Sequence, residues 1–167
     1  MRSLSHRSIG VRCDRRTRGD RQREDIFVET DIKFDCSGVD WNVVSETLRR
    51  VGMAYYEPDV HKRAFENSHT KVFVYHDDML IGFGRAISDG AYQAAIYDVA
   101  VAPEFQGQGI GTTIMRNILA RLPQCNFILY ASPGKEDFYR KIGLRKMKTG
   151  MAFFKRAEEM KEKGFTE

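Results

Sequence analysis

Hydrophobic residues recur along this chain with two different spacings, and these spacings predict its secondary structure. Val43, Val44 and Leu48 stand at the intervals of one helix face. Elsewhere, apolar residues alternate with polar ones or form short runs, as expected for strands buried on one or both faces. The predicted order is β-α-α-β-β-β-α-β-α-β-β. Strands are expected over residues 26–34, 70–76, 79–88, 91–101, 127–132, 144–149 and 151–154, and helices over residues 40–51, from Pro58 onward, over 110–121 and over 133–142.

Residues that favour caps and turns separate these elements. Asp40 stands where the N-cap of the first helix is expected, because its side chain can accept a hydrogen bond from the first turn. The pair Asp77-Asp78 predicts a turn between two strands, and Asp89-Gly90 is a typical hairpin turn. The elements follow one another without an internal repeat or a low-complexity linker, as in one compact domain.

Positive charge is concentrated at the beginning of the chain. Residues 1–25 hold eight Arg and four acidic residues, whereas residues 26–167 hold 19 Lys and Arg and 19 Asp and Glu. We therefore predict a disordered basic tail over residues 1–25 and one domain over residues 26–167. Because the domain is neutral overall, no nucleic-acid-binding face is expected on it. For the tail, an RNA- or membrane-contacting arm and an organellar transit peptide are alternatives, but the acids from Asp14 onward favour a solvated leader.

Composition also limits the compartment and the partners. No apolar run approaches the ~18–20 residues that a membrane-spanning helix needs, so no membrane association of the domain is expected. The three cysteines are odd in number and show neither a disulfide framework nor zinc-ligand spacing, which favours a reducing compartment. No metal is expected either, and surface roles are expected for His61, His69 and His76. These features predict a cytoplasmic protein.

The most specific chemistry lies in the sequence Val-Ala-Pro-Glu-Phe-Gln-Gly-Gln-Gly-Ile-Gly at residues 101–111. A predicted strand ends here, three alternating glycines follow, and an amphipathic helix begins. Glycines let a ligand approach the backbone, and unpaired N–H groups at a helix start point toward bound anions. A phosphorylated ligand is therefore expected. The loop has no Lys for a nucleotide P-loop, and Thr112 replaces the third glycine of the dinucleotide-binding fingerprint.

Residues 106–111 instead match the pattern Gln/Arg-x-x-Gly-x-Gly/Ala, and they follow the run Asp-Val-Ala-Val-x-Pro-x-Phe at residues 98–105. This segment resembles the pyrophosphate signature of the GNAT superfamily of N-acetyltransferases. The resemblance implies an α/β (α+β) fold with a mixed, mostly antiparallel central sheet. Helices flank that sheet, which is splayed between its fourth and fifth strands. The resemblance also implies acetyl-CoA as the co-substrate.

The resemblance assigns the acetyl-CoA contacts to particular residues. In the family, the pantetheine arm lies along the fourth strand like an added strand, and the pyrophosphate meets backbone N–H groups of the glycine loop. Because these contacts use backbone atoms, the side chains of the strand can still belong to the core. The expected pantetheine contacts are Val99, Ala100 and Val101, and the expected pyrophosphate contacts are Gln106, Gly107, Gln108, Gly109, Gly111 and Thr112.

Residues 138–144, Phe-Tyr-Arg-Lys-Ile-Gly-Leu, resemble the family's Phe-Tyr-x-x-x-Gly-Phe segment, with Leu144 in place of the usual Phe. This match assigns Tyr139 as the catalytic group beside the departing thiolate. A free tyrosine has a pKa of about 10 and a thiol of about 8.5, so complete proton transfer is uphill by roughly 2 kcal/mol. Tyr139 is therefore expected either to have a lowered pKa or to act mainly as a hydrogen-bond donor.

An alkylammonium acceptor must lose a proton before it can attack, and Asp98 on the fourth strand is the candidate base. A salt-bridging or backbone-capping role for Asp98 is the equally weighted alternative. Glu57 and Asp59 are candidates for attracting a cationic acceptor. The aromatic residues that could surround the acceptor, or belong to the core, are Trp41, Tyr55, Tyr56, Phe65, Tyr92, Phe153 and Phe154.

These residues predict an N-acetyltransferase that moves acetyl from acetyl-CoA directly to a primary amine of a small molecule. No cysteine lies in either motif, so an acyl-enzyme is not expected. Residues 85–97 and Gly150-Met151 resemble the small-amine acetyltransferases of plants and bacteria that include the serotonin N-acetyltransferase group. A protein or peptide acceptor and a non-catalytic acyl-CoA-binding module are the alternatives. A homodimer is left open, because dimers are common in the family.

Overall fold

The computed structural model describes residues 9–10 and 29–167. The predicted disordered tail over residues 1–25 lies outside the described residues, apart from the two-residue strand β1 (Ile9–Gly10). No helix in these described ranges is both long enough and apolar enough to span a membrane.

The described chain divides into two compact units, residues up to 127 and residues 128–167. The first unit holds the sheet and the three longest helices. Its elements are β1, β2 (Glu29–Lys33), α1 (Trp41–Arg50), α2 (Pro58–Glu66), β3 (Thr70–His76), β4 (Met79–Ser88), β5 (Gln93–Val101), the 3-10 helix η1 (Pro103–Phe105), α3 (Ile110–Arg121) and the start of β6 (Asn126–Ile128). The second unit holds two short helices, α4 (Glu136–Lys141) and α5 (Ala157–Glu162).

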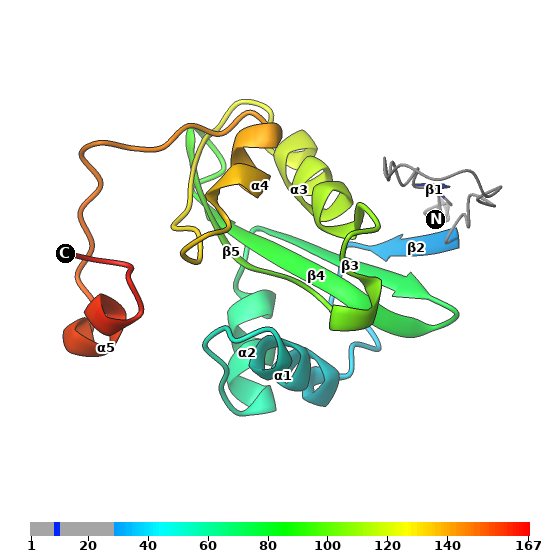
Figure 1. The fold of residues 1–167 in the computed structure, drawn as a ribbon. Coiled ribbons are helices and arrows are strands. Elements are labelled where there is room, and N and C mark those ends of the chain that lie inside the picture. Colours follow the sequence, from blue (N-terminus) through cyan, green and yellow to red (C-terminus); the bar gives the residue numbers. More distant parts are fainter. Residues whose placement is uncertain (1–8, 11–28) are drawn as a thin grey trace, which may run out of the picture. The chain divides into compact units, whose positions relative to one another are not determined.

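Among the described residues, six strands form one sheet in the order β1-β2-β3-β4-β5-β6. Each pair from β1 with β2 through β4 with β5 is antiparallel. Helices α1 and α2 cover one face of β3, β4 and β5, and α3 covers the opposite face (Figure 1). The predicted fold class, a mostly antiparallel sheet flanked by helices, is therefore confirmed.

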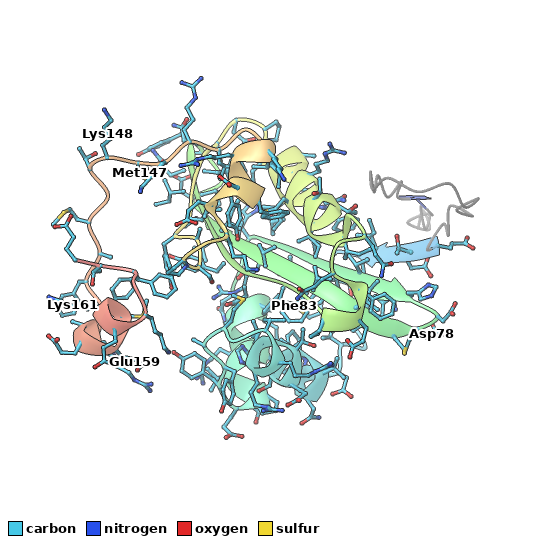
Figure 2. The ribbon with its side chains drawn as sticks, viewed as in Figure 1. Asp78, Phe83, Met147, Lys148, Glu159 and Lys161 are labelled. Atoms are coloured by element: carbon cyan, nitrogen blue, oxygen red, sulfur yellow. The ribbon has the colours of Figure 1, made fainter. Side chains whose placement is uncertain are left out.

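Strand β4 alternates small and large residues between the two helical layers. Gly82 and Gly84 lie under α3, because Cβ atoms built there would meet Ile110 and Ile114 at 3.1 and 2.7 Å. Phe83, between them, is fully buried and packs on the face that α1 and α2 cover (Figure 2). This alternation follows from the two-residue period of a strand. The glycines let α3 lie close to the sheet, while Phe83 fills the space on the other face.

Aromatic rings build the core between the sheet and the layer of α1 and α2. The ring centroid of Phe65 on α2 lies 5.3 Å from that of Phe73 on β3 and 5.8 Å from that of Phe83 on β4. Trp41 of α1 joins them, with its ring centroid 5.6 Å from that of Phe65. Such tilted and edge-on ring pairs stabilise the fold by more than the burial of their apolar area alone. Two of the aromatic residues considered for the acceptor, Trp41 and Phe65, therefore pack in the core.

The predicted caps and turns at the start of the domain are present. Asp40 caps α1, since its carboxylate accepts a hydrogen bond from the N–H of Asn42 at 2.9 Å. Pro58 begins α2. Proline has no backbone N–H, and at the first position of a helix this costs no hydrogen bond because that N–H would have no partner in the helix. Asp77 and Asp78 have φ angles of 46° and 61° in the turn between β3 and β4. Positive φ at both central residues is the geometry of a tight hairpin turn.

Two predicted elements are shorter than expected. The strand predicted over residues 127–132 is observed as β6 and ends at Ile128, and the helix predicted over residues 133–142 is observed as α4 and begins at Glu136. Pro133 and Gly134 form a turn instead of the first turn of this helix. Gly134 has a φ angle of 81°, which a right-handed helix cannot contain.

The predicted closing hairpin over residues 144–149 and 151–154 is wrong. Within the described chain, no strand is assigned between Leu144 and Phe154. Successive residues of a strand point to opposite faces. The adjacent charges of Arg145 and Lys146 would therefore lie on both faces, so that neither face could be buried. The short apolar segments on either side of Gly150 were not a sufficient signal for a paired strand.

Replacing Gly84 with Ala is expected to destabilise the first unit. The new Cβ would lie 2.7 Å from Cγ2 of Ile114, a methyl group bonded directly to Cβ, which cannot move away far without a shift of α3. Overpacking of this kind costs about 1–3 kcal/mol of unfolding free energy, which urea denaturation measures. Gly150→Ala is the matched control, because the nearest heavy atom to its Cβ position is 3.8 Å away. Equal effects of the two substitutions would contradict the packing argument.

Candidate functional site

Strand β5 contains a bulge opposite Gly84. The register of β5 with β4 shifts by one residue, so that Asp98 and Val99 together oppose Gly84. Asp98 has a φ angle of 53°, in the left-handed region where residues other than glycine are uncommon. A backbone conformation of this kind costs on the order of 1–3 kcal/mol and persists where surrounding contacts hold it. Bulges are over-represented next to active sites because they re-aim groups along a strand, so this part of β5 is a candidate site.

The side chain of Asp98 is held by Arg85 of β4. Nε of Arg85 donates to Oδ2 of Asp98 at 2.5 Å, and the two side chains are 14% and 20% exposed. Nη1 of Arg85 donates to Oγ of Ser68 at 3.2 Å. The ion pair that the sequence left open as an alternative is thus present. A role of Asp98 as a base stays a prediction.

The connection from β5 to α3 contains two glycines in the left-handed conformation. Gly107 and Gly109 have φ angles of 77° and 85°, and Gly109 is the N-cap of α3. The first helical hydrogen bond runs from the N–H of Thr113 to the carbonyl of Gly109 at 3.0 Å. The preceding N–H groups of α3 therefore have no acceptor within the helix, and with the helix dipole they make this end a candidate anion site. These groups belong to Ile110, Gly111 and Thr112.

Two glutamine side chains brace this loop. Nε2 of Gln106 donates to the carbonyl of Val101 at 3.0 Å, and Nε2 of Gln108 donates to the carbonyl of Glu104 at 3.2 Å. The backbone N–H of Gln106 donates to the carbonyl of Pro103 at 3.3 Å. That N–H is thereby engaged within the loop, which differs from the pyrophosphate contact expected for it.

The residues expected to contact pantetheine, Val99, Ala100 and Val101, lie at the C-terminal end of β5. The next strand, β6, has three residues and meets the start of β5, where the N–H of Asn126 donates to the carbonyl of Tyr92 at 2.8 Å. The separation expected between the fourth and fifth predicted strands, which are β5 and β6, stays a prediction.

The second unit carries Tyr139 on α4. The side chain is half-buried, and its ring centroid lies 4.9 Å from that of Phe138 in an edge-on contact. Burial raises the pKa of the Tyr139 phenol, because the phenolate would be poorly solvated. This direction is opposite to the lowered pKa that efficient proton donation requires. It favours the second of the two predicted roles, a hydrogen-bond donor.

The surface role expected for His61 is wrong. His61 of α2 is 3% exposed, and its Nε2 accepts the backbone N–H of Tyr56 at 2.9 Å, which places the proton of the neutral ring on Nδ1. Burial lowers the pKa of His61; Asp98 partly opposes this effect, and Arg85 adds to it. The signal that could have located His61 is its spacing from Phe65, four residues later on the same buried helix face.

The loop before α2 carries exposed aromatic and acidic groups. Tyr55 and Tyr56 are each 54% exposed, and Glu57 and Asp59 are exposed at the start of α2. His61 holds this loop from its buried side through the N–H of Tyr56. Within the part of the chain that the structure describes, no group of three or more His, Cys, Asp and Glu side chains is placed to hold a metal ion.

The bulged strand, the glycine loop and the helix N-terminus lie within the range that matches a known family. A model of the acetyltransferase (GNAT) domain matches residues 35–155, which is more than half of the chain. The chain belongs to the GNAT acetyltransferase family. The matched range includes the bulge, the candidate anion site of α3 and the helix that carries Tyr139.

Named proteins and a solved structure are similar to this GNAT chain. "Uncharacterized N-acetyltransferase ycf52" from Gracilaria tenuistipitata var. liui is 36% identical over 116 residues, which cover 68% of this chain and 59% of that protein. "Serotonin N-acetyltransferase 2, chloroplastic" from Oryza sativa subsp. japonica is 30% identical over 141 residues, which cover 77% of this chain and 70% of that protein. A GNAT-family acetyltransferase structure from Streptococcus pneumoniae TIGR4 shares the fold, with a TM-score of 0.64, 23% identity, and coverage of 76% of this chain and 98% of that one. This chain thus spans less than two thirds of the Gracilaria relative.

Gly109→Ala is expected to weaken binding of coenzyme A. The substitution strains a residue with a φ angle of 85° and adds a methyl group at the N-terminus of α3. A loss of about tenfold in affinity, or about 1.4 kcal/mol, is expected in isothermal titration. Gly38→Ala is the matched control, because Gly38 has a φ angle of 71° and no atom within 4 Å of its Cβ position. Unchanged affinity in Gly109→Ala would argue against an anion site at α3.

His61 is expected to make the fold less stable in mild acid. Because its pKa is lowered in the folded state, the unfolded chain takes up the proton first as pH falls below the ordinary histidine pKa of about 6.5. Stability that is present at neutral pH is therefore lost between that pH and the lower pKa of the folded state. Urea unfolding at several pH values should show a steeper loss in the wild type than in His61→Gln. Parallel pH profiles would contradict this assignment.

Proposed function

We propose that this GNAT chain is an N-acetyltransferase that moves acetyl from acetyl-CoA directly to a primary amine of a small molecule. The observation that carries the proposal is the succession of a bulged strand, a loop with two left-handed glycines, and a helix N-terminus with unpaired N–H groups. A strand edge suits an arm that contains amides, and a helix N-terminus suits a diphosphate. Pantetheine and pyrophosphate are these two groups.

Acetyl-CoA would be held mainly by backbone atoms of the first unit. Val99, Ala100 and Val101 would bond the amides of the pantetheine arm through their N–H and C=O groups. Because several amides share the charge of the pyrophosphate, no single side chain has to neutralise it. Gln106 would support the loop through the hydrogen bond from its side chain to the carbonyl of Val101. The residues proposed around the pyrophosphate are Gln106, Gly107, Gln108, Gly109, Gly111 and Thr112.

The acceptor amine must reach the thioester carbon as a neutral nucleophile. An ammonium group with a pKa near 10 loses its proton at pH 7 at a cost of about 4 kcal/mol. We assign the acceptance of this proton to Asp98. Since Arg85 holds Oδ2, Oδ1 is the oxygen proposed to receive it and pass it on to solvent.

Group transfer then requires these changes of bonding. The amine nitrogen forms a bond to the carbonyl carbon and loses a second proton to solvent, and the carbon–sulfur bond breaks so that sulfur leaves as a thiolate. The N–H of Val99, a residue of the bulge, is proposed to donate to the carbonyl oxygen while that oxygen carries negative charge. Tyr139 is proposed to donate a hydrogen bond to the thiolate. Its raised pKa supports donation of a hydrogen bond more than full proton transfer.

A small aromatic or aliphatic amine is the proposed acceptor. The rice relative is named for serotonin, which is an aromatic amine, and that name describes that protein. In this chain, the exposed rings of Tyr55 and Tyr56 beside Glu57 could bind an ammonium group through its attraction to aromatic faces and a carboxylate. A cytoplasmic location and a homodimer remain predictions for this chain.

Thiol release from acetyl-CoA tests the proposal against a panel of aryl-alkylamines, polyamines, amino sugars and short peptides. Turnover on one class of small amine is expected. Tyr139→Phe should lower kcat by about a hundredfold with little change in KM for acetyl-CoA, because the lost hydroxyl acts on the leaving sulfur. Tyr130→Phe removes a hydroxyl elsewhere in the same unit and is the control.

The other outcomes separate the alternatives. Turnover on peptides alone would favour a protein or peptide acceptor. Tight binding of acetyl-CoA without turnover on any acceptor would favour a non-catalytic acyl-CoA-binding module. A Tyr139→Phe variant as active as the wild type would remove Tyr139 from the mechanism.

A further inference from the structure

We propose that Arg85 is a positioning residue that holds the β5 bulge in the conformation that acetyl transfer needs. The catalytic consequence rests on the function proposed above, whereas the effect of Arg85 on the bulge does not. The side-chain hydrogen bonds of Arg85 run to Asp98 and Ser68, so its influence on the reaction would pass through Asp98 and the bulge.

The first argument is the geometry at Asp98. Its φ angle of 53° lies in the left-handed region, which is uncommon for a residue other than glycine and, inside a strand, persists where surrounding contacts hold it. The contact that does so is the hydrogen-bonded ion pair with Nε of Arg85 at 2.5 Å. Both side chains are mostly buried, and the pair is therefore screened less by solvent than a surface ion pair. Loss of the guanidinium would leave a mostly buried carboxylate without its partner.

The second argument is that Arg85 is itself anchored on other elements. Its Nη1 donates to Oγ of Ser68, and Oγ of Ser68 donates to the carbonyl of Ala64 on α2 at 2.7 Å. The guanidinium carbon also lies 5.7 Å from the ring centroid of Phe65 on α2 and 5.2 Å from that of Tyr97 on β5. Arg85 is thus held between α2 and β5 by groups other than Asp98. An anchor that is fixed independently can impose a conformation on the residue it binds.

The third argument is the position of Val99. Val99 follows Asp98 in the bulge, and its Cγ2 lies 3.2 Å from the Cβ position of Gly84. A relaxation of Asp98 toward an ordinary strand conformation would therefore turn the backbone of Val99. The N–H of Val99 is the group proposed to face the thioester oxygen. Arg85 would thus set the direction of that N–H without contacting the substrate.

The test combines Arg85→Met, Asp98→Gly and the double variant. Arg85→Met is expected to lower kcat by about tenfold or more, which corresponds to at least about 1.4 kcal/mol, with the dissociation constant of coenzyme A changed less than about threefold. Glycine adopts positive φ without an external contact. Adding Arg85→Met to Asp98→Gly should therefore change kcat less than about twofold. If the losses of kcat in the two single variants multiply in the double variant, the proposal is overturned.

Hydrogen exchange of the peptide that contains residues 97–101 gives a readout that needs no activity. Arg85→Met should accelerate exchange there by about tenfold, and Arg85→Lys, which keeps the charge, should restore part of the protection. Arg49→Met is the control, because it removes an exposed ion pair with Glu46 and should change neither exchange in this peptide nor kcat. Unchanged exchange in Arg85→Met would overturn the proposal. If the wild type turns over no amine while exchange responds as expected, the proposed function fails and the positioning role stands.

Discussion

The absence of a side chain at Gly84 is the constraint on which the rest of the first unit depends. A Cβ atom there would meet Ile114 of α3 at 2.7 Å and Val99 of β5 at 3.2 Å. One position on β4 thus admits both the close approach of α3 and the bulge of the neighbouring strand. Because α3 follows β5 after a short loop, its depth on the sheet also sets where its N-terminal N–H groups lie. The candidate anion site and the candidate oxyanion donor therefore depend on the same small residue.

Burial affects the polar groups described above in different ways. Arg85 and Asp98 form an ion pair, so each charged side chain has a partner of opposite sign. For His61 and for Tyr139, burial moves the pKa in the direction that favours the neutral form, although Asp98 partly opposes this effect at His61. A neutral His61 keeps the loop before α2 in place through the N–H of Tyr56. A neutral Tyr139 keeps its hydroxyl available as a hydrogen-bond donor.

Sequence reasoning was most successful where the relevant interactions are local. The caps at Asp40 and Pro58 involve atoms within one helical turn, and the glycine loop carries its conformational requirement in its own residues. It was less successful for contacts between distant residues. The partnership of Arg85 with Asp98 crosses from one strand to the next at a bulge, where simple alternation of faces no longer applies. The mistaken closing hairpin shows the same limit, since a glycine between two short apolar segments does not supply a partner strand.

By itself, the sequence determined the family, the order of strands and α-helices from β2 to α3, and the glycine loop that precedes that helix. Each depends on residue types and spacings that act over a few positions of the chain. Only the tertiary structure decided that Asp98 is ion-paired and held at positive φ, that His61 is buried and neutral, and that Gly84 lies under both α3 and Val99. The physical reason is that burial, pairing and close packing depend on which distant residues the fold brings together, and no local pattern encodes that.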